Sequence, residues 1–313
     1  MASSGMSSPQ AQEILLGIDF GAPSQGRAQR KKIIVVAGER VQPRHYHIAL
    51  RGINLHLMRD PPGWSAIELL ELLLSFPFAL VAIDCPIGLP ISLLDHPRFA
   101  KLINHPHPFG SWWHFSAAVA DRLPLKDPLD FKPFERWRDP SERNWIWEKR
   151  MTDRITRSQP PLKSAFPCIF NMTILGHAII YHLRKRGLYR VIPFDAYEST
   201  PSIIEVYPRA TLSSFGLHSY KGQAKKAVDL AIRQMEARGI ALETDPPILA
   251  RSITYRSSPS DNDLADGLIA LFTGILYFER MAHPAFRGDE KVMRREGVIW
   301  QPAPQHLKQI QRV

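Results

Sequence analysis

Three short apolar segments of this chain each carry one carboxylate. The segment I-L-L-G-I-D-F-G-A-P carries Asp19 where its apolar run ends, A-L-V-A-I-D-C-P carries Asp84 in the same position, and S-I-I-E-V-Y-P contains Glu205. A buried strand accommodates a charge only when a metal, a base or a ligand compensates it, because removing an isolated charge from water is costly. The pattern therefore predicts buried strands whose carboxylates meet at one acidic site.

The first part of the chain alternates strands with short polar connections. Apolar stretches over Ile14–Asp19, Ile33–Ala37 and Tyr46–Leu57 predict three strands, separated by a turn rich in Gly, Ser and Arg and by residues 38–44. Strands joined by short connections pair antiparallel, since a parallel crossover needs a dozen or more residues. We therefore expect an antiparallel meander.

Further elements follow from apolar periodicity. A helix is expected to begin at Trp64–Glu68, where Ser65 can cap the backbone and Glu68 can reach back to it, and to run to about Ser75. The remaining predictions, in chain order, are a strand at Leu80–Asp84, a helix at Phe170–Lys185, a strand at Ile203–Tyr207, helices at Gly222–Arg238 and Leu264–Phe278, and a strand at Gly297–Trp300.

Periodicity fails between residues 86 and 168. Prolines are frequent there, and the stretch holds Trp112, Trp113, Trp137, Trp145 and Trp147. It predicts an inserted subdomain of short helices with its own small core, in which mixed charges such as those at 148–150 pair at a solvated face. Bases of a nucleic acid could stack on the tryptophans, although burial is the commoner use of such side chains.

The resulting domain plan is an α/β fold with a long Pro- and Trp-rich insertion. Its parts are a disordered N-terminal tail at 1–12, a main domain at 13–85 and 169–303, the insertion at 86–168 and a C-terminal tail at 304–313.

Composition favours an anionic partner. The chain has 40 basic and 30 acidic residues, a formal charge of +10 and a pI near 9.7, which suits nucleic acid but also an ordinary basic soluble protein. Two cysteines, Cys85 and Cys168, form no C-x-x-C pair, so we expect reduced thiols and a cytoplasmic protein. Glutamates and prolines interrupt the longest apolar region, which excludes a conventional membrane-spanning helix.

Two more carboxylates join the three on the strands. Asp263 and Asp266 are three residues apart on the last predicted helix and therefore share a face. Five oxygen ligands suit Mg²⁺ or Mn²⁺, and two such ions roughly 3.5 to 4 Å apart can activate water and stabilise the leaving oxygen of a phosphodiester. Lys221, in Y-K-G, could reach a phosphate or the attacking water.

All of these residues except Asp266 also have a simpler interpretation. Asp263 could complete a capping box with Ser260, Asp19 and Asp84 could shape turns, Glu205 could face water, and Lys221 could be an ordinary exposed lysine. Asp266, among apolar neighbours, has no such role. One shared site explains all five carboxylates with a single cause.

Other chemistries lack their motifs. The chain has no G-x-x-x-x-G-K-[ST], no G-x-G-x-x-G after a strand and no G-x-S-x-G. A zinc site needs further cysteine or glutamate ligands, and these are missing near the pairs His105 and His107, and His45 and His47. We therefore expect structural or surface histidines there.

The acidic segments resemble a known family, catalogued as domain of unknown function 429 and described as predicted nucleases with an RNase H-like fold. The pieces that carry the resemblance appear in the family's order, at Gly17–Pro23, Ala82–Pro90, Ile204–Pro208, Ser219–Gly222, Asp263–Ala270 and Glu296–Pro302. The chain departs from the family pattern at Gly267, where Ala is usual, and in its long insertion.

The resemblance implies a mixed five-stranded sheet flanked by helices, with its first three strands antiparallel and a metal site at the ends of the central strands. It carries the acidic roles onto Asp19, Asp84, Glu205, Asp263 and Asp266. The nuclease description is itself an inference from fold, and fold alone does not fix function.

The expected function is a nuclease that hydrolyses phosphodiester bonds with two divalent ions. In this hypothesis Asp19 bridges both ions, Asp84 and Asp266 hold one each, and Glu205 and Asp263 complete the shell or position water. Two alternatives stay open. One is an ATP-binding protein of the actin and sugar-kinase type, which shares such a sheet and a D-x-G turn; the other is a non-catalytic nucleic-acid-binding protein.

Overall fold

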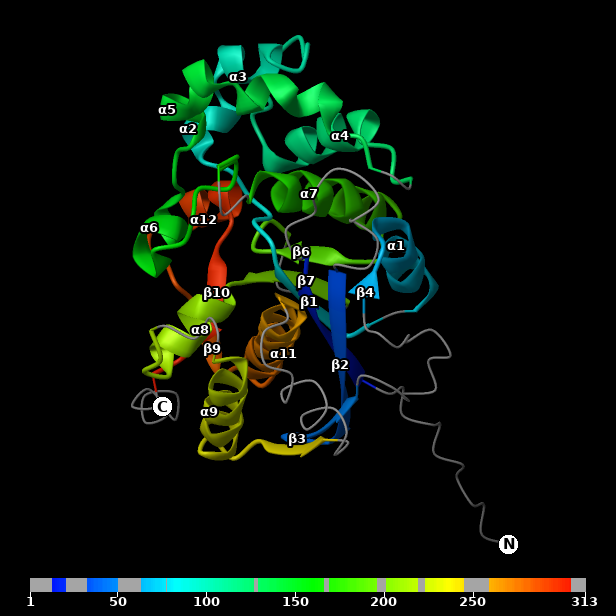
Figure 1. Ribbon diagram of the computed structural model, residues 1–313, viewed down its shortest axis with the longest axis vertical. Coiled ribbons are helices and arrows are strands. Elements are labelled where there is room, and N and C mark those ends of the chain that lie inside the picture. The colour runs from blue at the N-terminus through cyan, green and yellow to red at the C-terminus, as the bar shows by residue number, and fades with distance from the viewer. Residues whose placement is uncertain are drawn as a thin grey trace, which may run out of the picture.

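A computed structural model gives the arrangement of the chain (Figure 1). It describes residues 13–20, 33–49, 63–76, 78–126, 129–165, 169–195, 201–218, 223–244 and 259–304. The expected N-terminal tail and Lys221 lie outside these ranges.

The described strands form one mixed sheet. Its order is β8-β3-β2-β1-β5-β7-β10-β9, with β4 paired to β2 and β6 paired to β7. The strand bounds are β1 Glu13–Asp19, β2 Ile33–Gln42, β3 His45–Ala49, β4 Gly63–Trp64, β5 Leu80–Asp84, β6 Arg190–Ile192, β7 Ser202–Val206, β8 Ala241–Thr244, β9 Ala282–Pro284 and β10 Ile299–Pro302.

The strand directions confirm the predicted meander. β1 pairs antiparallel with β2, and β2 with β3, whereas β1, β5 and β7 run parallel. The expected count of five strands is wrong for the described chain, because this sheet has ten. Besides β10, which the sequence predicts at Gly297–Trp300, the additional strands are β4, β6, β8 and β9. They have two to four residues each, and segments that short carry little periodicity to detect.

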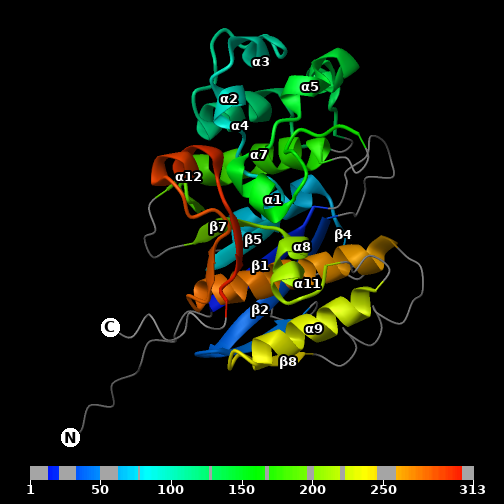
Figure 2. The same cartoon turned by 90° about the vertical axis from the view of Figure 1, so that its left-hand side faces the viewer.

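Helices cover both faces of the sheet (Figure 2). The described α-helices are α1 Ala66–Ser75, α2 Ile91–Leu94, α3 Pro97–Lys101, α4 Trp112–Arg122, α5 Arg143–Ile146, α6 Met151–Thr156, α7 Phe170–Lys185, α8 Pro208–Ser214, α9 Ala224–Glu236, α11 Pro259–Phe278 and α12 Glu290–Glu296; short 3₁₀ helices occupy Lys132–Arg138 and Pro140–Glu142. The predicted bounds of α7 are confirmed. So is the capping box of α1, in which the Glu68 amide donates to Ser65 Oγ at 3.3 Å and the Ser65 amide donates to the Glu68 carboxylate at 3.0 Å.

Strand β1 is apolar on both faces because each face meets helices. Ile14, Leu16 and Ile18 belong to the core shared with α1, α7 and the insertion. Leu15 belongs to the core shared with α8, α9 and α11. Alternate residues of a strand point to opposite faces, so Gly17 and Asp19 follow Leu15 onto the α11 face.

Helix α11 crosses the sheet at very short range. A Cβ atom on Gly17 would lie 2.3 Å from the Gly267 carbonyl oxygen and 2.3 Å from the Leu271 amide nitrogen. Only glycine therefore fits at this crossing, which brings the backbone of α11 against β1 two residues before Asp19.

The insertion packs over α7, on the face of the sheet away from α11 (Figures 1 and 2). Phe99 stacks on Trp137 with ring centroids 4.7 Å apart, and Phe115 on Trp137 at 5.6 Å. These side chains belong to the same buried cluster as Ile14, Leu16 and Ile18 of β1. The insertion therefore shares its core with the sheet, contrary to the prediction of a separate one.

Two of the insertion's tryptophans are buried, as expected of such side chains. Trp137 is fully enclosed and Trp112 is 5% exposed. Trp113 is partly buried, and its ring already contacts Tyr181 at 4.7 Å and the guanidinium of Arg184 at 4.5 Å. No described helix is long and apolar enough to cross a membrane.

Candidate functional site

Asp19 and Asp84 end two adjacent parallel strands. The register of β1 and β5 pairs Asp19 directly with Asp84. Paired residues of neighbouring strands point to the same face and lie about 5 Å apart. Because Leu80 and Ala82 of β5 belong to the α11 core, Asp84 shares that face with Asp19. Asp19 is only 4% exposed and Asp84 is half-buried, so the structure brings these two predicted residues together.

Helix α11 supplies Asp263 and Asp266 to the same side of the sheet. Both side chains are half-buried, and Asp266 directly precedes Gly267, where the helix touches β1. Further along the same helix face, Thr273 Oγ1 lies 2.8 Å from Thr211 Oγ1 of α8. The helix face that carries Asp266 therefore points toward α8, the segment that follows β7.

Tyr207 connects the strand-end aspartate to the helix. It follows β7 directly and begins α8. Burial raises the pKa of the Tyr207 phenol, and the nearby carboxylates of Asp84 and Asp266 raise it further. The Arg209 guanidinium donates a hydrogen bond to the phenol and opposes this shift. Asp84, Asp266, Tyr207 and Arg209 therefore share one electrostatic environment.

Tyr207 and Arg209 are not among the residues that the sequence predicts for this site. Nothing in E-V-Y-P-R distinguishes them from an ordinary strand end and helix start, and they become visible only when β7 is placed beside β5. Arg209 is exposed on the first turn of α8, so its charge lies at the rim of the acidic group.

Glu205 lies on the other face of the sheet. The register of β5 and β7 pairs it with Ile83, which belongs to the core under the insertion. Its carboxylate accepts hydrogen bonds from Arg150 Nη1 at 2.7 Å, from Arg150 Nη2 at 2.6 Å and from the Ile87 amide at 3.0 Å. The structure thus separates Glu205 from the pair Asp19 and Asp84.

Arg150 is the centre of this second acidic group. Its side chain is fully buried, and it also donates to Asp153 Oδ2 at 2.9 Å and Oδ1 at 2.8 Å. Burial alone would lower the pKa of Arg150, but the carboxylates of Asp153 and Glu205 raise it well above its usual value, so the side chain stays charged. The prediction that the charges at 148–150 pair at a solvated face is wrong for Arg150.

The α11 face offers oxygen ligands for a divalent cation. Among the described residues, no three or more His, Cys, Asp or Glu side chains are placed to hold a metal by themselves. Mg²⁺ nevertheless is usually held by one or two carboxylates, with waters and substrate phosphates completing its shell. The paired carboxylates of Asp19 and Asp84 fit that donor set, and Asp266 and Asp263 add to it.

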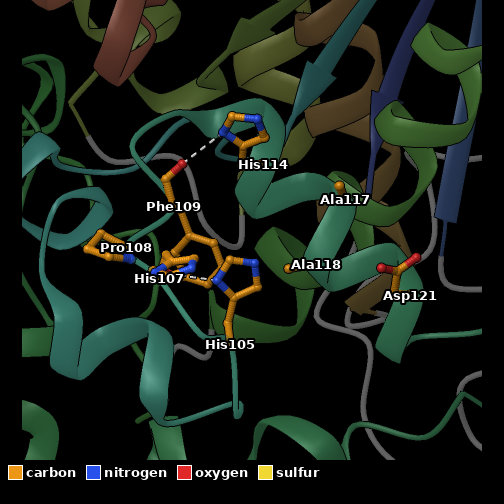
Figure 3. Close-up of a pocket in the computed structure, with 8 residues that line it drawn as sticks. All are labelled: His105, His107, Pro108, Phe109, His114, Ala117, Ala118 and Asp121. Atoms are coloured by element: carbon orange, nitrogen blue, oxygen red, sulfur yellow. Dashed lines mark hydrogen bonds between the residues drawn. The ribbon is translucent and has the colours of Figure 1, made fainter.

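A separate pocket of about 330 Å³ lies in the insertion, between α4 and the loop before it (Figure 3). His105 Nδ1 is 2.6 Å from the His107 carbonyl oxygen, and His114 Nδ1 is 3.0 Å from the Phe109 carbonyl oxygen. Because a carbonyl oxygen only accepts, each of these Nδ1 atoms carries a proton in this arrangement. This pocket is built from different elements than the strand-end carboxylates.

Comparison with known proteins found no match. No family model, no curated protein and no solved structure is similar to this chain.

Proposed function

We propose that this protein is a divalent-metal-dependent nuclease whose metal site is formed by Asp19, Asp84, Asp266 and Asp263. The observation that carries the proposal is the in-register pairing of Asp19 with Asp84 on the face crossed by α11. Two adjacent carboxylates at strand ends repel each other, and a divalent cation between them offsets that repulsion.

The proposed fold class is RNase H-like. The central strand order β3-β2-β1-β5-β7, with an antiparallel meander followed by parallel strands, agrees with what the family resemblance implies. The additional strands lie at the edges of this central set or pair beside it. The packing of helix α11 against β1 also supports this class, because Asp266 directly precedes the residue at which the two elements touch.

The chain's own residues have distinct roles in this proposal. Asp19, the most buried of these four carboxylates, would hold the metal together with Asp84 and Asp266, and Asp263 would orient water at the outer edge. When bound, Mg²⁺ or Mn²⁺ supplies Lewis-acid activation of water and charge stabilisation at the phosphorus. We leave Glu205 outside the metal site because its carboxylate is occupied by Arg150.

Arg209 would bind the substrate. A site made of carboxylates repels a phosphodiester, so a cation is needed on the approach to it. Arg209 is exposed at the rim and is tied to Tyr207, which lies near Asp84 and Asp266. Its planar guanidinium suits a phosphate group. Lys221 stays a further candidate for this role.

The test is cleavage of end-labelled single-stranded, duplex and branched DNA and RNA with Mg²⁺, with Mn²⁺ and with a chelator. Cleavage that requires the metal and is lost in Asp19→Asn supports the proposal. The matched control is Glu236→Gln, an exposed carboxylate on α9. Activity unchanged in Asp19→Asn would refute the proposed mechanism.

Substrate binding is tested separately with Arg209→Ala. We expect its KM to rise about tenfold, because a charge-assisted hydrogen bond contributes about 1.5 to 3 kcal/mol. The matched control is Arg233→Ala, an exposed arginine of α9. An equal effect of both changes would mean that only net charge matters.

The two alternative functions give different outcomes in the same experiments. Salt-dependent nucleic-acid binding without turnover in any metal identifies a non-catalytic binder. Thermal stabilisation by ATP would favour the actin and sugar-kinase type.

A further inference from the structure

Two glutamates connect the loop that follows Asp84 to the start of α6 in the insertion. Glu205 accepts from the Ile87 amide and from Arg150, the residue before α6. Glu296 accepts from the Ile91 amide at 3.1 Å and from the Met151 amide, the first of α6, at 3.0 Å. Both carboxylates therefore bridge the same two segments, residues 85–91 and the start of α6.

Packing makes this junction tight. A Cβ atom on Gly88 would lie 1.9 Å from the Glu296 carbonyl oxygen, so the loop backbone touches the end of α12 directly. On the other side of α6, Thr152 Oγ1 accepts from the Ile299 amide of β10 at 2.9 Å. The loop after Asp84 is thus held between α12, α6 and the sheet.

The charges at the junction satisfy one another. The Arg150 guanidinium makes two hydrogen bonds to each of its carboxylates, and Ser158 Oγ donates to Asp153 at 2.7 Å. Replacing such a buried ion cluster by apolar side chains is often neutral for stability, so stability alone does not explain it. Its directional bonds fix the positions of the groups that make them.

We propose that Arg150 and Glu205 are positioning residues that hold Asp84 in place beside Asp19. The inference rests on the proposed function, because Asp84 is assigned there to the metal site. Glu205 acts from the far face of the sheet: it pairs with Ile83 in the strand and binds the amide three residues after Asp84. The insertion, through Arg150, thereby controls the geometry of the Asp84 carboxylate from the opposite face of the sheet.

The test uses Glu205→Gln and Arg150→Lys in the full chain. Gln has the shape of Glu205, but its NH₂ group cannot accept a hydrogen bond from an N–H donor. Lys lacks the planar guanidinium that hydrogen-bonds to two carboxylates at once. The matched control is Glu142→Gln, since Glu142 is also a buried partner of an arginine, Arg98 at 2.7 Å, elsewhere in the insertion.

Three measurements are made on each variant: amide hydrogen exchange of residues 85–91, Mn²⁺ affinity, and kcat with KM. We expect faster exchange in the loop, a fall of about tenfold in Mn²⁺ affinity or in kcat, as for other outer-shell partners of a metal, and an unchanged KM. The control should lose stability without any of these changes.

One result would overturn the inference. Loop exchange, Mn²⁺ affinity and kcat equal to those of the control would leave the junction a merely structural one. A wild-type protein that neither binds Mn²⁺ nor cleaves nucleic acid would instead overturn the proposed function, while the exchange measurement still reports on the junction.

Discussion

Two acidic groups lie on opposite faces of the same sheet, and they are built in opposite ways. Under the insertion, Glu205 and Asp153 share one fully buried arginine whose hydrogen bonds run to both of them. On the α11 face, Asp19 and Asp84 lie in register with each other, and Arg209 lies at an exposed rim.

The comparison of the two groups distinguishes a buried carboxylate with a structural role from one with a chemical role. Arg150 is bound in a fixed planar arrangement, which leaves its two carboxylates little capacity for a ligand. The α11 face places carboxylates of like charge next to one another, an arrangement that costs stability and is typical of sites that bind cations. The two groups should therefore respond differently to the same kind of substitution.

The largest expected effect is on the insertion side. Arg150→Ala leaves Asp153 and Glu205 as adjacent buried charges without their common partner, which should lower the free energy of unfolding by about 3 to 5 kcal/mol. Urea unfolding followed by circular dichroism measures the change. Arg154→Ala, an exposed arginine on the same helix, is the control and should be nearly neutral. Equal stability of the two variants would remove the contrast between the two acidic groups.

The next effect concerns activity on the α11 face. Asp19→Asn should reduce kcat more than about 100-fold, because even outer-shell partners of a metal cost 10- to 100-fold. Its free energy of unfolding should change less than that of Arg150→Ala, because Asn keeps the shape and one acceptor oxygen of Asp19 and relieves repulsion from Asp84. Metal-dependent cleavage and urea unfolding of the same preparation test both statements. A loss of stability as large as that of Arg150→Ala would show that Asp19 is structural.

Sequence patterns were sufficient for the strands that end at Asp19 and Asp84. The helical spacing of apolar residues also predicted α7, because a helix that is packed along its whole length has apolar residues at every turn. Edge strands of two to four residues carry none, which explains why the sheet has more strands than expected.

The placement of Glu205 could not be predicted, because it depends on register. Glu205 pairs with Ile83, whereas pairing with Asp84 would have placed it on the α11 face; a shift by one residue reverses every side chain of a strand. Arg150 was missed for a related reason, since its partner Glu205 lies 55 residues away and no local pattern records that distance. Its spacing to Asp153, three residues along a helix start, was the one local signal.

A smaller effect should follow from loosening the crossing between β1 and α11. Gly17→Ala places a methyl group 2.3 Å from the backbone of Gly267 and Leu271, and such overpacking costs about 1 to 3 kcal/mol. Activity should fall as well, because the helix that carries Asp266 must move away. Gly38→Ala on β2 is the control: its Cβ would meet only side-chain ends of Ile48 and Leu271, at 3.2 and 3.4 Å. Equal losses in both variants would argue against a special role for this crossing.

The last expected effect is a pH dependence near the buried arginine. His177 is fully buried, with Nδ1 2.7 Å from Ser116 Oγ, and burial together with the positive charge of Arg150 lowers its pKa to about 3. In the unfolded chain the pKa of histidine is about 6.5, so the unfolded state takes up the proton first as the pH falls. The stability contributed by neutral His177 is therefore complete above pH ~6.5 and should decline by about 1.4 kcal/mol per pH unit below it, until about pH 3. Carboxylates titrate in the same range, so the informative quantity is the difference between the wild type and His177→Gln, measured by urea unfolding from about pH 7 to about pH 5. If both proteins lose stability in parallel, His177 is hydrated or charged in the folded state, and the positive charge of Arg150 is then compensated differently from the arrangement described above.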